Sequence, residues 1–338
     1  MHWRRLPSRY LRCAPVWAGW NLARRAARGT DRTMTTSAKA ELPMLTMDPL
    51  ASGPDQDDLV QVVREDPAAR PQRVPPIVRT EHFCLRRCDR RLEVSHWLKP
   101  EQLDADIGGL LVDELFAPGW LTGASVFERV FIGVARSTGD DPLQSWITFY
   151  ENTLARIHEY WRVPQRDPRQ SWIADGAHVL QRVLRLVPAG EVLDLGSCLG
   201  FLPLLLVERA QNTVTASNIS SGAVRLLAAV AARRRTPLRT LVCDAAFVPL
   251  PDDAVDTVTV IHLLEHLDDQ EGHHVLREAV RLARHRVIVA VGSHHESNAA
   301  RQPVRGFSRD RLIEMGMRTG MRFDAEEFDG GWLVIHVG

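Results

Sequence analysis

The hydrophobic pattern changes near residue 190. Before it, three stretches carry apolar residues at the three- and four-residue spacing of an amphipathic helix: 98–117 ("LKPEQLDADIGGLLVDELFA"), 146–161 ("WITFYENTLARIHEYW") and 173–187 ("IADGAHVLQRVLRLV"). Each predicts a helix. The aromatic residues from Trp146 to Trp161 share one helical face, which favours a place in the core over a role as a lid on a ligand.

After residue 190, short apolar segments alternate with helical ones. The expected strands are 191–195, 213–218, 239–244, 256–262, 285–291 and 331–337. This alternation predicts an α/β fold: a doubly wound, mostly parallel Rossmann-like sheet, preceded by a mainly helical N-terminal segment. In such a sheet, ligands bind in the crevice at the carboxyl ends of the strands.

Composition divides the first half of the chain further. Residues 1–33 are rich in arginine, with Asp31 as their one acidic residue, and Met34 then opens an ordinary polar sequence. We expect 1–33 to be a basic extension that is disordered or precedes the true start codon, a targeting segment being the alternative. Residues 34–76 are rich in Pro, Asp and Ser without a period, which predicts a flexible leader. The expected domains are then 77–171, a mainly helical segment and candidate cover for the substrate, and 172–338, the ligand-binding α/β domain.

Charge and cysteine content narrow the functional classes. Apolar residues make up 45% of the 338-residue chain and its formal net charge is zero. A neutral chain is not expected to bind nucleic acid, and no apolar run approaches the ~20 residues of a membrane span. The odd number of cysteines, five, in a chain of this size suits free thiols in the reducing cytoplasm.

The turn after the first expected strand carries the candidate chemistry. "EVLDLGSCLG" (191–200) ends an apolar strand in a glycine turn that leads into the apolar helical stretch "FLPLLLVERA". A nicotinamide-type loop needs glycines at offsets one, three and six, of which only Gly196 is present. Asp194, Gly196 and Gly200 fit a different pattern, in which an acid precedes the first glycine by two residues and Cys198 is the one deviation. An acid at the strand end would repel a pyrophosphate, and it suits a cationic ligand with an amine, such as S-adenosylmethionine.

Four further features make the chain resemble the class I S-adenosylmethionine-dependent methyltransferases over roughly residues 172–338. In order, they are "TASNISSGAVRLL", "VCDAAFVPLPDDAVDTVTV", "HLLEHLDD" and "PVRGFSRDRLIEMGMRTGMRFDAEEF". The resemblance implies S-adenosylmethionine as cofactor, with Asn218 at the ribose hydroxyls, Asp244 at the adenine amino group and the Ala245 amide at the ring. The full set of implied cofactor residues is Asp194, Gly196, Ser197, Gly200, Asn218, Ile219, Asp244, Ala245 and His262. Asn218 stands where the family has an acid, so a weaker, neutral hydrogen bond is expected there; the alternative is that it caps the following helix.

Methyl transfer to a hydroxyl gains from a positioned base. His294 and His295 follow the fifth strand, and His262 follows the fourth, so all three are expected at the crevice; His295 and His294 are the favoured catalytic candidates and His262 the third. "HLLEH" also matches a zinc-protease signature, but that needs both histidines on one helix, and His262 ends a strand-like run. No metal is expected.

The stretch "RTEHFCLRRCDRRLEVSHWLKPEQL" (79–103), followed by the methyltransferase half, resembles the methyltransferases of the mycofactocin pathway. That resemblance implies O-methylation of a sugar hydroxyl on a glycosylated small molecule, a mycofactocin-type oligosaccharide. A methyltransferase of a lipid, a polyketide or another small molecule, and a degenerate non-catalytic S-adenosylmethionine-binding module, remain the alternatives.

Overall fold

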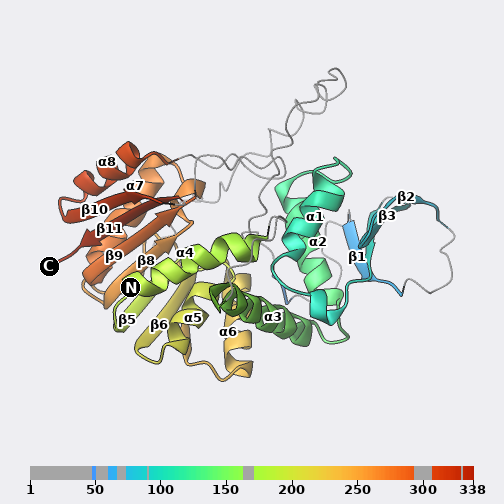
Figure 1. Ribbon diagram of the computed structural model, residues 1–338, viewed down its shortest axis with the longest axis horizontal. Coiled ribbons are helices and arrows are strands. Elements are labelled where there is room, and N and C mark those ends of the chain that lie inside the picture. Colours follow the sequence, from blue (N-terminus) through green and yellow to red (C-terminus); the bar gives the residue numbers. More distant parts are fainter. Residues whose placement is uncertain are drawn as a thin grey trace, which may run out of the picture. The chain divides into compact units, whose positions relative to one another are not determined.

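The computed structural model describes residues 48–50, 60–66, 74–89, 91–162, 171–292, 307–328 and 330–338. Its C-terminal half contains a seven-stranded sheet in the order β10-β11-β9-β8-β5-β6-β7 (Figure 1). The strands are β5 (Gly190–Leu195), β6 (Asn212–Asn218), β7 (Leu238–Val242), β8 (Val255–Ile261), β9 (Ala283–Val291), β10 (Arg322–Glu327) and β11 (Gly331–His336). β5 to β9 are parallel, whereas β11 is antiparallel to β9 and to β10. All six expected strands are therefore confirmed.

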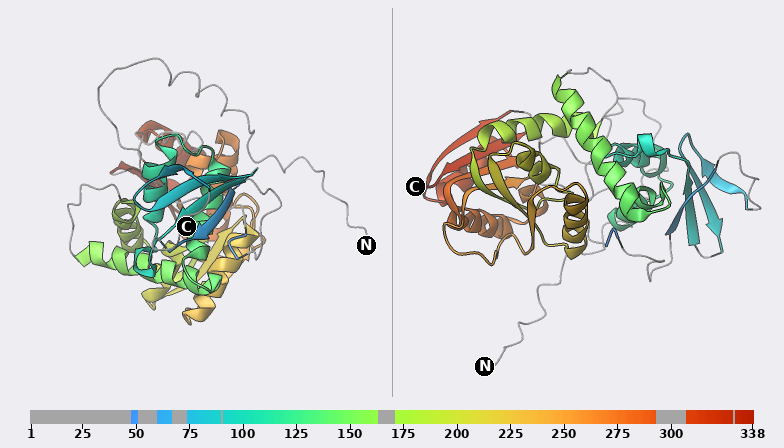
Figure 2. Two further views of the ribbon diagram at one scale, coloured as in Figure 1. Left: turned by 90° about the vertical axis from the view of Figure 1, so that its right-hand side faces the viewer. Right: turned by 90° about the horizontal axis from the view of Figure 1, so that it is seen from below.

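Helices cover both faces of this sheet. α4 (Trp172–Leu186), α5 (Phe201–Glu208) and α6 (Ser221–Arg233) cover one face, and α7 (Asp269–Leu282) and α8 (Arg309–Arg318) cover the other (Figures 1 and 2). Strand order reverses between β5 and β8, because β6 and β7 follow on one side of β5 and β8 and β9 on the other. The doubly wound prediction is confirmed, and the switch point lies beside the glycine turn.

The N-terminal half holds a second sheet that the sequence analysis did not anticipate. Its four strands run in the order β1-β4-β3-β2: β1 (Val60–Arg64), β2 (Pro76–Arg79), β3 (Phe83–Cys88) and β4 (Arg91–His96). The expectation of a flexible leader over 34–76 is wrong for residues 60–64, because β1 pairs in parallel with β4. The mainly helical description of 77–171 likewise omits β2, β3 and β4.

The helices of that half follow the sheet. The single helix expected over 98–117 is instead a 3-10 turn (Pro100–Gln102), the short helix α1 (Ile107–Leu111) and a π-helical turn (Val112–Phe116). α2 (Ala124–Ser137), which no pattern had indicated, packs on β1. α3 (Pro142–Arg162) and α4 match the remaining two expected helices.

One apolar cluster links the two halves. It runs from Phe83 and Val94 in the small sheet, through the buried residues of α1 to α4, to the α5–α6 face of the large sheet. Trp146, Phe149 and Tyr150 are fully buried in it, so the aromatic face of α3 belongs to the core, as predicted. Over the described residues, no helix combines the length and the apolar character that crossing a membrane requires.

Candidate functional site

The glycine turn after β5 has the backbone of a ligand cradle. Gly196, Cys198 and Gly200 have φ values of 73°, 50° and 77°, all in the left-handed region. Ser197 N–H donates to the Ser217 carbonyl at 2.8 Å, and Gly200 N–H donates to the Ser197 carbonyl at 2.7 Å. The turn is thus fixed to β6 and leads directly into α5. A residue other than glycine is strained at such φ values, so Cys198 stands at the one costly position.

Asp194 lies beneath this turn. Its side chain is buried at 3% exposure, and its Oδ1 accepts a hydrogen bond from the Thr259 hydroxyl at 2.6 Å. Burial raises the pKa of Asp194 to about 6, although hydrogen bonds from Thr259 and Ser197 lower it. The Asp194 carboxyl group therefore links β5 to β8 through a buried hydrogen bond. Its contact with a ligand amine stays a prediction.

Asn218 ends β6 in a tight polar turn. Its Oδ1 accepts from the Ser220 N–H at 2.8 Å, and the Ser220 hydroxyl in turn accepts from Ala223 N–H at 3.2 Å. Ser220 is therefore the N-cap of α6. Because Ser220 fills that position, the alternative that Asn218 caps the helix is wrong.

Asp244, Ala245 and Phe247 follow the neighbouring strand, β7. The Asp244 side chain is exposed, and its Oδ1 accepts from Ala246 N–H at 2.9 Å. Two large apolar side chains stand exposed just past the ends of these paired strands, Ile219 at 61% and Phe247 at 71%. Phe247 was not anticipated, although its apolar character three residues after Asp244 was a usable signal.

His262 stands immediately after β8, with φ of 53° and a side chain that is 45% exposed. Its Nδ1 lies 2.8 Å from Oε1 of Glu265, which also accepts from Gly292 N–H at 3.1 Å. Glu265 is buried at 3% exposure, and its other oxygen, Oε2, has no partner among the described residues. Burial raises the pKa of Glu265, but the hydrogen bond and charge of His262 outweigh it, so the net shift is downward and the group is a carboxylate. No pattern in the sequence had indicated a role for Glu265.

These groups fit S-adenosylmethionine. Hydrogen-bond acceptors on Asn218 and Asp244 suit ribose hydroxyls and an adenine amine, and exposed Ile219 and Phe247 offer apolar surface to a ring. Positive φ at Gly196 and Gly200 lets the backbone approach a ligand closely.

Two predicted catalytic residues, His294 and His295, lie outside the described residues. Among the residues that are described, no group of three or more His, Cys, Asp or Glu side chains could hold a metal ion. His262 lies past the end of β8 and His266 in a 3-10 turn, so the two do not share the helix that the zinc signature requires.

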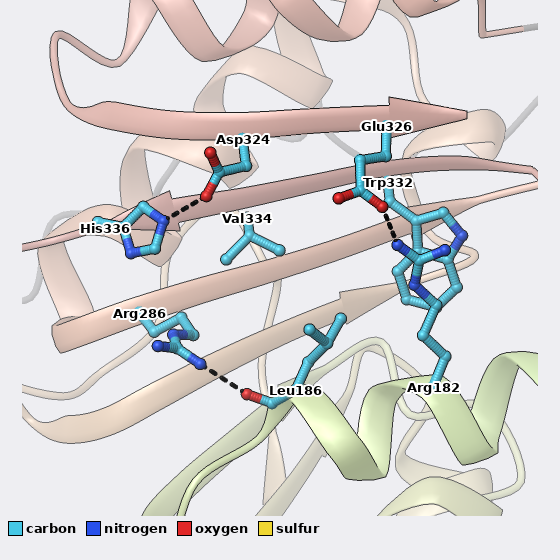
Figure 3. A pocket seen from close by; sticks show the side chains of 8 residues that line it. All are labelled: Arg182, Leu186, Arg286, Asp324, Glu326, Trp332, Val334 and His336. Carbon is cyan, nitrogen blue, oxygen red and sulfur yellow. Dashed lines mark hydrogen bonds and ion pairs between the residues drawn. The ribbon is translucent and has the colours of Figure 1, made fainter. Parts of the chain in front are cut away.

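A separate pocket of about 240 Å³ lies between α4 and the face of β9, β11 and β10 (Figure 3). Arg182 pairs with Glu326 in it, His336 pairs with Asp324 at 2.7 Å, and Arg286 donates to the Leu186 carbonyl at 2.8 Å. The Arg182 guanidinium also lies 4.5 Å from the centre of the Trp332 ring. No predicted site residue lines it, so it is not the crevice at the strand ends.

Comparison with known proteins finds a family match over part of the chain. Residues 193–291 match the family described as a methyltransferase domain. No curated protein matches the chain.

Similar solved structures include three that overlap the chain in part. The [4+2]-cyclase SpnF is 20% identical, with 48% of this chain and 64% of that chain covered and a TM-score of 0.41. The magnesium protoporphyrin IX methyltransferase of Synechocystis PCC 6803, with bound S-adenosylmethionine, is 15% identical, with 55% of this chain and 97% of that chain covered and a TM-score of 0.40. PH0226 of Pyrococcus horikoshii OT3 is 19% identical, with 53% of this chain and 98% of that chain covered and a TM-score of 0.41. The chain thus spans just under two thirds of the cyclase.

The order of the seven strands, with its antiparallel β11, defines a Rossmann-like α/β domain around the glycine turn. The match to a methyltransferase domain covers residues 193–291 of this α/β domain, from β5 to the end of β9, and so includes the glycine turn.

Proposed function

We propose that the protein is an S-adenosylmethionine-dependent methyltransferase, and that it methylates a hydroxyl oxygen of a glycosylated small molecule, of the mycofactocin oligosaccharide type. The observation that carries hydroxyl chemistry is the His262–Glu265 pair at the carboxyl end of β8, beside the glycine turn. The sugar acceptor is supported by the resemblance of residues 79–103 to the mycofactocin methyltransferases.

The cofactor, when bound, supplies an activated methyl group, so the protein must hold the acceptor in line and accept its proton. A hydroxyl is a poor nucleophile until that proton is shared with a base. His262 has a half-exposed ring, and the buried Glu265 carboxylate fixes Nδ1 and stabilises the protonated ring. In this proposal His262 is the base, Glu265 positions it, and His294 and His295 remain the alternative bases.

The cofactor residues of the proposal are the turn at Asp194, Gly196, Ser197 and Gly200, the β6 end at Asn218 and Ile219, and the β7 end at Asp244 and Ala245, with His262 beside them. Within residues 79–103, Arg86 is buried and paired with Glu65 at 3.0 Å, so the proposal does not assign it to the acceptor. Trp97 is half-buried beneath the Arg79 guanidinium, 4.6 Å from its ring centre.

Transfer of labelled methyl groups from S-adenosylmethionine tests the proposal. A glycoside panel should be labelled on oxygen, and mass spectrometry of a deletion strain should show a glycoside lighter by one methyl. His262→Ala should lower kcat by ~10²–10⁴-fold. In Glu265→Gln, which keeps the acceptor for Gly292 N–H, the acid limb of the pH–rate profile should move to lower pH, since the anion facing the ring is gone.

His294→Ala and His295→Ala are the matched variants. If either of them, and not His262→Ala, abolishes transfer, the base is in that segment. Labelling of lipids or polyketides in place of glycosides would refute the sugar acceptor, and cofactor binding without transfer to any acceptor would favour a binding module.

A further inference from the structure

Tyr150 reaches the glycine turn from outside the matched family region. It lies on α3, is fully buried, and its hydroxyl donates to the Leu199 carbonyl at 2.7 Å. Its ring packs against Phe149 and against Phe201, the first residue of α5, with centroids 5.7 and 5.2 Å away. Burial raises the pKa of Tyr150 well above its ordinary value, so the hydroxyl remains a donor.

Cys198, the residue before that carbonyl, has the left-handed backbone that a β-carbon disfavours. Its side chain packs against the apolar cluster that contains Tyr150 and Phe201. The cost of the missing glycine therefore falls on the backbone of Cys198.

Other bonds hold the turn on either side of this peptide. Ser197 is bonded to Ser217 through its backbone, and Gly200 N–H is bonded to Ser197. The carbonyl of Leu199 is the acceptor that α3 restrains, one peptide after the strained residue. A fixed carbonyl at this point limits the rotation by which Cys198 would return to a negative φ.

We propose that Tyr150 is a positioning residue for the cofactor turn, whose hydroxyl holds the Leu199 carbonyl and so keeps Cys198 in the left-handed conformation that receives S-adenosylmethionine. The proposal rests on the assignment of residues 194–200 to the cofactor. In this proposal the Tyr150 hydrogen bond compensates for the β-carbon of Cys198. A chain with glycine at position 198 would not need that hydrogen bond.

A double-mutant cycle tests this coupling, with affinity for S-adenosylhomocysteine measured by calorimetry. Tyr150→Phe removes the donor and should weaken binding about tenfold, the effect of losing one hydrogen bond to a buried acceptor. In a Cys198→Gly background, where the left-handed backbone is unstrained, the same change should cost about threefold or less. In a Cys198→Ala background the strain persists, and the loss should again be about tenfold.

Tyr160→Phe is the matched control, because it removes a hydroxyl from a buried tyrosine of the same helix whose partner is Arg156. It should leave affinity unchanged. Equal losses from Tyr150→Phe in all three backgrounds, or no loss in the wild type, would overturn the proposal. Relief by Cys198→Ala as well as Cys198→Gly would also overturn it, since the thiol and not the backbone would then be the partner.

Urea unfolding of the same variants separates this proposal from the cofactor assignment. The restraint predicts the same order in stability, with Tyr150→Phe costing least in the Cys198→Gly background. If the stability costs follow this order but no variant binds the cofactor, the Tyr150 restraint is supported and the assignment of residues 194–200 to the cofactor is refuted. If Tyr150→Phe lowers the free energy of unfolding equally in all three backgrounds, the restraint is refuted, whether or not the cofactor binds.

Discussion

Substitutions of single side chains at the strand ends should affect either cofactor affinity or stability. Asn218 and its neighbour Ser220 show the difference most clearly. The Oδ1 of Asn218 holds Ser220 N–H, whereas the cap of α6 is the Ser220 hydroxyl. If Asn218 binds the ribose, Asn218→Ala should weaken cofactor affinity. Asn218→Asp should leave it level or tighten it up to roughly tenfold, because hydrogen bonds to a charged acceptor are stronger by ~1 kcal/mol.

Ser220→Ala is the control for that pair. It removes the cap and should lower the free energy of unfolding by about 1 kcal/mol while affinity stays unchanged. Calorimetry and chemical denaturation on the three variants decide the matter. Unchanged affinity in both Asn218 variants would remove this residue from the site.

At the level of whole elements, the packing of α2 on β1 depends on a glycine. A β-carbon added at Gly133 would lie 2.5 Å from Cγ2 of Val62. Gly133→Ala should therefore push β1 away from the helix and cost about 1–3 kcal/mol of stability. Gly108 in α1 is the matched position, where an added β-carbon meets Phe131 at an ordinary 3.8 Å.

Gly108→Ala should be neutral or slightly stabilising, because alanine favours a helix by up to about 1 kcal/mol over glycine. Denaturation in urea compares the two variants. Equal stability would mean that β1 does not pack on α2 as described. Residues 60–64 would then belong to the flexible leader that the sequence predicts.

Sequence patterns predicted the large sheet because its strands are apolar runs bounded by turn residues, as in β8 (Val255–Ile261) and β9 (Ala283–Val291). They missed the small sheet, in which the central strand β3 (Phe83–Cys88) carries no alternation. β3 buries Phe83, Cys84, Leu85 and Arg86 in succession, and the charge of Arg86 is offset by Glu65, distant in sequence. Such a pairing is visible only once the fold has brought the strands together.

The candidate site divides in the same way. Spacing and resemblance predicted Gly196, Gly200 and Asp244, because a glycine turn and a strand end are both features of a short stretch of sequence. Tyr150 and Glu265 do not, since their roles arise from contacts: a buried hydroxyl 49 residues from its acceptor, and a carboxylate between the ends of β8 and β9.

Over the whole molecule, the shared apolar cluster implies that the two halves unfold together. Two buried titratable groups, one in each half, provide the test. Burial, with the charge of Arg64, lowers the pKa of His96 in β4 to about 4, and burial raises that of Asp194 in β5 to about 6. Their ordinary values are 6.5 and 3.8, so the two shifts have opposite consequences for stability.

The unfolded chain protonates His96 first as pH falls, so its contribution to stability is lost between pH 6.5 and 4. The folded chain holds the Asp194 proton longer as pH rises, so stability falls between pH 3.8 and 6 through that group. At about 1.36 kcal/mol per pKa unit, each contribution changes by about 2–3 kcal/mol between about pH 7 and 4.5.

Relative to the wild type, His96→Gln should therefore gain about 2–3 kcal/mol on going from about pH 7 to 4.5, and Asp194→Asn should lose about 2 kcal/mol. Gln can still bond Ser137, whose hydroxyl lies 2.8 Å from the His96 ring. Urea unfolding followed by tryptophan fluorescence and circular dichroism measures both differences. If the halves form one cooperative unit, both variants shift the same transition, seen alike by both probes. Two transitions, with His96→Gln moving one and Asp194→Asn the other, would show that the cluster does not couple the small sheet to the large sheet.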